Sequence, residues 1–328
     1  MRGLIIGCGS AGRRHLRNLR ELRDLDLIAY RHALGDSEAL KREFGVQTYL
    51  DLDEALALHP IFAIIANPPR YHVPVALAAA QAGCHLLIEK PLSDSLEGVQ
   101  DLITTVRERN VVALVGFTLR FHPGLRVLKS LLEEERVGRV VSVRAEVGQY
   151  LPDWHPGEDY RKSYSAKRDL GGGVILDLIH ELDYVRWLVG EVREVACMAG
   201  HESRLEIETE DVAEILLRFE SGAIGNVHMD YVQRDPSRTC RIVGEEGTIV
   251  WDYFASEVRL FEATSQSWRV FPQDRFDRND LFLSEMKHFL ACVDGRETPV
   301  VDLEEARRVQ VLALAAQESA CSGKVCSV

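Results

Sequence analysis

A glycine-rich turn near the start of the chain, Gly7-Cys8-Gly9-Ser10-Ala11-Gly12, constrains the fold more than any other feature. It follows the apolar run Leu4-Ile5-Ile6, typical of a buried strand, and precedes a helical pattern from Arg13 to Leu22. In such a unit the first glycine permits a tight turn, the second admits a pyrophosphate and the third lets the helix pack closely. The helix N-terminus then favours the phosphate charge. The turn predicts a dinucleotide site that comprises Gly7, Gly9, Ser10, Ala11 and Gly12.

The residues up to 118 continue this alternation of strand and helix. Strand patterns occur at Leu25 to Tyr30, Phe62 to Ala66, Leu86 to Ile88 and Val111 to Val115, and helical patterns at 51–56, 73–82 and 95–109. Alternation of this kind predicts a doubly wound parallel sheet, in which ligands bind outside the carboxyl ends of the strands. We therefore expect a Rossmann domain over residues 1–118.

Two polar segments follow strands of this predicted sheet. Asn67-Pro68, with His72 shortly after, and Glu89-Lys90-Pro91 stand at neighbouring strand ends and are expected to line the cofactor crevice. A lysine in that place can polarise a carbonyl or help an alcohol to lose its proton. By itself a Lys-Pro pair is also common where a strand simply enters a turn.

The end of the second strand bears on the choice of cofactor. An Asp or Glu there would bind the ribose hydroxyls of NAD. The sequence instead reads Tyr30-Arg31-His32, and Arg31 would suit a 2'-phosphate. The cofactor is NAD or NADP, with a lean toward NADP, and an exposed basic turn is the alternative.

Beyond residue 118 the pattern changes to strands in succession, which favours a largely antiparallel open sheet. We expect an α/β protein in which residues 119–328 form a second domain for substrate binding and oligomerisation. A helix near residues 302–320 is expected to pack back on the first domain.

One predicted helix in this half, Val174 to Leu188, carries polar residues at helical spacing, namely Asp177, His180, Glu181 and Tyr184. They would share one face. Either this face meets water, as in many packed helices, or it faces the crevice, where Asp177 would orient His180 as a general base.

Further candidates for substrate binding are Arg120, Trp154, His155 and Tyr164. Aromatic faces and fixed donors suit a polyhydroxylated ring. A structural salt bridge for Arg120 and an ordinary surface loop for the others are the alternatives.

The charge, the lengths of the apolar runs and the cysteine spacing limit the kinds of partner that we expect. The net charge of −12 argues against nucleic acid. No apolar run reaches the length of a membrane helix, and no signal peptide is expected. The seven cysteines are scattered without metal-ligand spacing, so we expect no metal site and a cytoplasmic location.

Taken together, the glycine turn, Asn67-Pro68 with His72, Glu89-Lys90-Pro91, the triplet Gly171-Gly172-Gly173 and the run from His180 to Asp183 resemble the glucose-fructose oxidoreductase, inositol dehydrogenase and MocA family. The resemblance implies NAD(P)-dependent oxidation or reduction of sugars, nucleotide sugars or cyclitols by a homodimer or homotetramer. It implies that Lys90 contacts substrate and nicotinamide ribose and that His180 is the catalytic histidine. The family's aspartate commonly stands four residues before that histidine, whereas Asp177 stands three before.

The expected reaction is hydride transfer between a secondary alcohol carbon and nicotinamide C4. His180 would remove the hydroxyl proton, Lys90 would stabilise the alkoxide and Asp177 would orient the histidine. Two alternatives remain: a cofactor-binding regulator without turnover, and an enzyme that uses transient oxidation for elimination, epimerisation or glycoside cleavage.

Overall fold

The computed structural model describes residues 1–32, 37–273 and 277–328. The chain forms two compact units, one made of Met1–Thr118 with Asp277–Arg307 and the other of Leu119–Phe276 with Arg308–Val328. The first division between the units falls after Thr118. Residues 277–307, which were expected in the second domain, belong to the first unit because the helix at 278–293 packs beside the helix that follows the glycine turn.

The first unit contains a six-stranded parallel sheet in the order β3-β2-β1-β4-β5-β6. Its strands are β1 (Arg2–Ile6), β2 (Asp26–Tyr30), β3 (Gln47–Tyr49), β4 (Phe62–Ile65), β5 (His85–Glu89) and β6 (Ala113–Gly116). Its helices are α1 (Ser10–Leu22), α2 (Ser37–Phe44), α3 (Leu52–Leu56), α4 (His72–Gln81), α5 (Val99–Glu108) and α9 (Arg278–Val293), with a 3-10 turn at Pro69–Tyr71.

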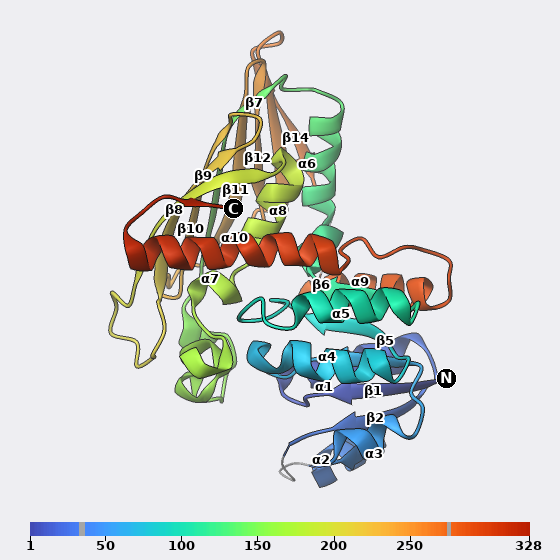
Figure 1. The fold of residues 1–328 in the computed structure, drawn as a ribbon. Helices are drawn as coiled ribbons and strands as arrows, with labels where there is room; N and C mark the ends of the chain where they lie inside the picture. The colour runs from blue at the N-terminus through green and yellow to red at the C-terminus, as the bar shows by residue number, and fades with distance from the viewer. Residues whose placement is uncertain (33–36, 274–276) are drawn as a thin grey trace. The chain divides into compact units, whose positions relative to one another are not determined.

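Helices cover the sheet of the first unit because its central strands are apolar on both faces. The residues of β4 are all buried, as are the central residues of β5. Helices α4 and α5 pack side by side, as Figure 1 shows, and α1 packs beside α9. Right-handed crossovers place α1 and α4 on opposite faces. Because β1, β4 and β5 are parallel, their carboxyl ends lie at the same end of the sheet.

The second unit contains a nine-stranded sheet in the order β14-β13-β12-β11-β7-β10-β9-β8-β15 (Figure 1). Its strands are β7 (Val140–Gly148), β8 (Val192–Gly200), β9 (Val212–Phe219), β10 (Ile224–Asp230), β11 (Ser237–Gly244), β12 (Gly247–Asp252), β13 (Glu257–Glu262), β14 (Ser267–Pro272) and β15 (Cys326–Ser327). All of its pairings are antiparallel except that of β7 with β10. The expected largely antiparallel sheet is thus confirmed.

Helices pack on one face of this second sheet. They include α6 (Pro123–Glu133), α7 (Val174–Asp177) and α8 (His180–Val189), and α10 (Leu303–Ser322) runs from the first unit into the second. Short 3-10 turns occupy Thr118–Phe121, Leu151–Asp153, Tyr160–Lys162, Tyr164–Ala166 and Arg168–Leu170. Helix α8 packs on β7, and α7 packs on β9 and β10. Alternate residues of the strands point to the other face, where Leu216 and Ile224 are exposed.

The described part of the chain has neither a membrane-spanning helix nor a group of metal ligands. None of its helices is both long and apolar enough to cross a membrane. It contains no group of three or more His, Cys, Asp or Glu residues placed to hold a metal ion.

His228 on β10 lies between two carboxylates on the solvent-facing side of the second sheet. Its Nδ1 is 2.7 Å from Glu214 Oε1, and its Nε2 is 2.9 Å from Asp230 Oδ2. The hydrogen bond to Asp230 raises the pKa of His228 to about 9, although partial burial opposes the rise and Glu214 adds to it. A pKa above the usual 6.5 means that the pairing contributes its full stability below about pH 6.5 and loses it as pH rises through 9.

We predict that His228→Gln lowers the free energy of unfolding by about 2 kcal/mol at pH 6, and that the difference shrinks as pH approaches 10. Chemical denaturation at several pH values measures it. The control is His201→Gln, since His201 is exposed and lies 3.5 Å from one carboxylate, that of Asp211. A difference that grows with pH would contradict the charged pairing of His228.

Candidate active site

The glycine turn joins β1 to α1 in the first unit, and its three glycines serve different purposes. Gly7 has φ +88°, and its N–H donates to Tyr30 O at 3.1 Å. A Cβ on Gly12 would stand 2.0 Å from Gly7 O, so the helix can approach the turn only without a side chain there. A Cβ on Gly9 would meet no atom within 4 Å. The backbone at Gly9 is therefore open, as a pyrophosphate at the N-terminus of α1 requires.

Ser10 and Ala11 form the first positions of α1, where Ser10 is exposed and Ala11 half-buried. No acidic residue occupies the first turn of this helix. The positive end of a 13-residue helix thus stands beside the open backbone of Gly9. These residues fit a bound dinucleotide.

Two guanidinium groups lie near this turn. Burial raises the pKa of the Cys8 thiol to about 11, against the opposing positive charges of Arg31 and Arg13. Arg13 also forms an ion pair with Glu43, at 2.6 Å. Arg31 follows β2, and its N–H donates to Tyr49 O. Arg31 is half-buried and stands at the strand end where the adenosine of a dinucleotide binds in folds of this type.

The ends of β4 and β5 are joined by His72, the first residue of α4. Its Nε2 lies 2.7 Å from Asn67 O and its Nδ1 lies 2.9 Å from Pro91 O. The side chain is buried, and that burial lowers its pKa while both backbone carbonyls oppose the change. His72 therefore braces the two segments predicted to line the crevice. Pro68 immediately precedes the 3-10 turn of this brace.

Lys90 directly follows β5 and is half-buried. Its positive charge acts on Glu89 and on His72. Glu89 turns into the unit, where His15 Nε2 lies 2.7 Å from its Oε1. Glu89 was expected at the cofactor, whereas His15 was not expected here, because residues 74 positions apart give no local signal of contact.

In the second unit the predicted helix from 174 to 188 is wrong in one respect. The structure has two helices, α7 ending at Asp177 and α8 beginning at His180, because Leu178 leaves helical geometry with φ −94° and ψ 25°. Asp177 and His180 therefore do not lie on one continuous helix, and the expected continuous polar face is absent. The alternative of a face turned to water fails too, since Asp177, Glu181 and Tyr184 are buried and His180 is half-buried.

Asp177 is 2% exposed and accepts hydrogen bonds from three hydroxyl groups. Tyr164 Oη donates at 2.5 Å, Ser165 Oγ at 2.6 Å and Tyr231 Oη at 3.2 Å. These contacts tie α7 to the preceding loop and to the end of β10. Asp177 thereby holds Tyr164, a predicted substrate residue, close to the helix break that precedes His180. Ser165 and Tyr231 were missed because isolated hydroxyl residues carry no distinctive pattern.

Two acidic residues on α8, Glu181 and Asp183, are buried and form ion pairs with arginines. Asp183 receives a bidentate contact from Arg120, at 2.7 and 2.8 Å, and the guanidinium lies 4.7 Å from the Trp187 ring centre. Glu181 lies 2.9 Å from Arg238 Nε. Arg120 thus forms the structural salt bridge that the sequence left as an alternative to substrate binding.

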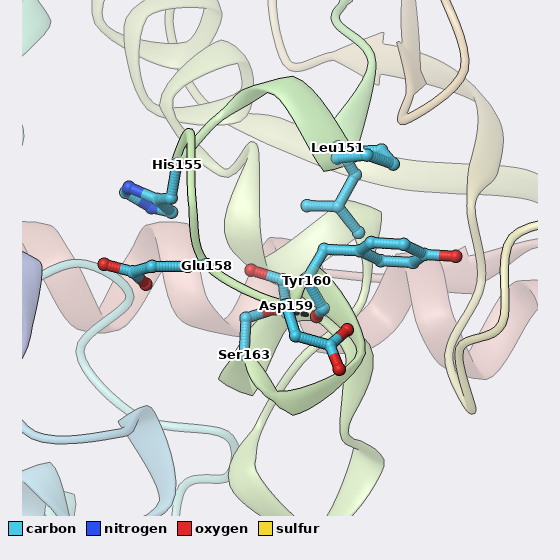
Figure 2. A pocket seen from close by; sticks show the side chains of 8 residues that line it. Leu151, His155, Glu158, Asp159, Tyr160 and Ser163 are labelled. Carbon is cyan, nitrogen blue, oxygen red and sulfur yellow. Dashed lines mark hydrogen bonds between the residues drawn. The ribbon is translucent and has the colours of Figure 1, made fainter.

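The loop between β7 and α7 contains the other predicted substrate residues. Trp154 packs edge-on against Tyr231, with ring centres 5.4 Å apart, and His155 is exposed. A pocket in this loop is lined by Leu151, Pro152, His155, Glu158, Asp159, Tyr160, Ser163 and Ser165. Figure 2 shows Leu151 and Tyr160 on one side of the pocket and His155 and Glu158 on the other. Ser165 joins this pocket to the hydroxyl cluster around Asp177.

Two family models match this chain in order. "Oxidoreductase family, NAD-binding Rossmann fold" matches residues 1–117, and "GFO/IDH/MocA C-terminal domain" matches residues 125–250. The chain belongs to the Gfo/Idh/MocA family of oxidoreductases, and its first unit is an NAD-binding Rossmann domain.

Named relatives agree with this assignment. Myo-inositol 2-dehydrogenase of Thermotoga maritima is 28% identical over 340 residues, which cover 97% of this chain and 96% of that protein. Levoglucosan dehydrogenase of Pseudarthrobacter phenanthrenivorans is 30% identical over 215 residues, 58% of this chain, and the match spans only 54% of that relative. The solved structure of a levoglucosan dehydrogenase with NADH and levoglucosan has the same fold, with a TM-score of 0.88 and 22% identity over 100% of this chain and 99% of the other.

The glycine turn supports a matched pair of substitutions. We predict that Gly12→Ala destabilises the protein by at least about 2 kcal/mol, since the new methyl would meet a backbone carbonyl. Gly9→Ala should leave stability nearly unchanged and weaken dinucleotide binding at least about tenfold, since its methyl fills the open approach.

Thermal unfolding without cofactor and fluorescence titration with reduced dinucleotide separate the two effects. Dinucleotide affinity equal to that of the wild type in Gly9→Ala would show that the pyrophosphate does not bind at this turn.

Proposed function

We propose that this protein is an NAD(P)-dependent dehydrogenase that acts on a secondary alcohol or ketone of a sugar, nucleotide sugar or cyclitol. The observation that carries the proposal is the placement of Lys90 at the carboxyl end of β5, in the same unit and the same sheet as the open glycine turn. Ligands of such sheets bind at these strand ends. A bound nicotinamide would supply the hydride acceptor or donor.

Within this proposal Lys90 holds its ammonium toward the substrate oxygen and stabilises negative charge on it. His180 accepts the hydroxyl proton, and its place at the start of α8 leaves it half-buried. Asp177 contributes by fixing Tyr164 and the end of α7, through its three hydroxyl contacts. Trp154, His155 and Tyr164 form one loop with polar and aromatic groups that suit a polyhydroxylated ring.

The relatives support the substrate class. Their names refer to myo-inositol and levoglucosan, which are both polyhydroxylated rings. A panel of sugars, nucleotide sugars and cyclitols, scored by absorbance of reduced nicotinamide, tests the proposal. Cofactor binding without any turnover would point to a regulator, and product formation without net reduced cofactor would point to transient oxidation.

Assembly through the second sheet is part of the proposal. Its solvent-facing side carries Met198, Leu216 and Ile224, of which Met198 is 83% exposed. Burial of these side chains would favour a homodimer or homotetramer. The seven free thiols support a reducing, cytoplasmic location.

We predict that Lys90→Ala and His180→Ala each reduce kcat at least about a thousandfold and change dinucleotide affinity less than about threefold. Steady-state kinetics and fluorescence titration provide both numbers. Lys287→Ala on the exposed side of α9 is the control and should retain turnover. Full activity in either variant would remove that residue from the reaction.

The lean toward NADP rests on Arg31 and has its own test. Arg31→Ala should weaken NADP binding at least about tenfold and NAD binding much less, because only NADP offers a 2'-phosphate. Arg109→Ala, at the exposed end of α5, serves as the control. Equal effects on the two dinucleotides would overturn the preference.

A further inference from the structure

Charged groups from three separate elements meet around Glu89, the neighbour of Lys90 in the first unit. His15 on α1 has no exposed surface and holds Glu89, the last residue of β5, at 2.7 Å. Arg14 Nη2 lies 3.8 Å from the same Glu89 oxygen. Glu285 on α9 is only 1% exposed. None of these contacts takes part in the proposed proton and hydride steps.

Helix α9 brings Glu285 to this cluster. The Arg14 guanidinium lies 3.6 Å from the ring centre of Phe282, one helical turn before Glu285. Residues three apart on a helix share a face, so Glu285 points to the side of α9 that meets α1. Its carboxyl is close enough to feel the charges of both Glu89 and Arg14.

The two carboxyl groups in this interior have opposite tendencies. Burial would raise the pKa of Glu89, but the hydrogen bond and charge of His15, with Arg14 and Lys90, bring it down to about 2. Burial raises the pKa of Glu285 well above its usual value, and the charge of Glu89 raises it further against the opposing effect of Arg14. Two neighbouring carboxyls in a largely buried site do not readily both ionise.

The hydrogen bonding of Glu285 agrees with this division. Within residues 1–32, 37–273 and 277–328, Glu285 Oε1 has no hydrogen-bond partner. An ionised carboxylate in that position would be a buried charge with an unsatisfied oxygen, which costs far more than a neutral acid. Glu89, by contrast, has its donor in His15.

We propose that Glu89 is the positioning residue for Lys90 and carries the negative charge of this cluster while Glu285 retains its proton. The inference rests on the proposed function, in which Lys90 acts on the substrate. The backbone on one side of Lys90 is anchored through Glu89 to α1, and on the other side Pro91 O is anchored through His72 to α4. The anion also attracts the ammonium of its neighbour.

The first test removes the anion with little change of shape. Glu89→Gln should lower kcat at least about tenfold, leave KM for the dinucleotide within about threefold and alter the pH dependence of kcat, and Glu89→Asp should restore part of the rate. The control is Glu108→Gln, the same change on the exposed side of α5. An unchanged kcat and pH profile in Glu89→Gln would overturn the positioning role.

The second test addresses the proton on Glu285 and needs no turnover. A carboxyl with a raised pKa in the folded state contributes stability that is complete below its usual pKa of 4.5 and is lost as pH rises. The amide in Glu285→Gln does not titrate. The unfolding equilibrium constant of the wild type should therefore rise, relative to that of the variant, by up to about tenfold per pH unit above pH 5.

The outcomes separate this inference from the function on which it rests. Loss of turnover in Lys90→Ala with full turnover in Glu89→Gln overturns the inference alone. Full turnover in Lys90→Ala overturns the proposed function and the role of Glu89 with it. A ratio of unfolding constants that is independent of pH overturns the protonated state of Glu285 in either case.

Discussion

The close approach of α1 to the turn before it is the contact on which the first unit depends. The missing side chain at Gly12 lets the helix come against the carbonyl of Gly7. That approach aims the helix N-terminus at the open backbone of Gly9, and it also carries His15 to the end of β5. The absence of a side chain at Gly12 thus allows both the shape of the nucleotide loop and the contact between His15 and Glu89, which precedes Lys90.

Ion pairs with a buried partner occur in both units. Arg120 with Asp183 and Arg238 with Glu181 hold α8, and His15 with Glu89 holds the end of β5. Taking one partner away would leave an isolated charge in the interior, which is strongly unfavourable. The residues in these pairs therefore hold the surrounding helices and strands in place.

Much of the fold followed from local patterns. The strand expected at 62–66 and the helix expected at 73–82 lie within one residue of those bounds, because periodicity and glycine turns act over short distances. Helix α2 and strands β3, β13, β14 and β15 were not expected; of these, β3 and β15 are very short and β14 is mostly exposed, so their patterns are weak. The break between α7 and α8 escaped notice because apolar residues on both sides continued the helical period.

The sequence by itself determined the class of fold, the family and the identity of Lys90 and His180 as candidates, since these depend on short motifs in a fixed order. Only the tertiary structure decided what surrounds them. Asp177 accepts hydrogen bonds from Tyr164, Ser165 and Tyr231, and Arg120 pairs with Asp183. Glu285 on α9 lies close enough to Glu89 to feel its charge, although the two are nearly two hundred positions apart in the chain. Contacts of this kind depend on how whole helices and strands pack, and no local pattern encodes them.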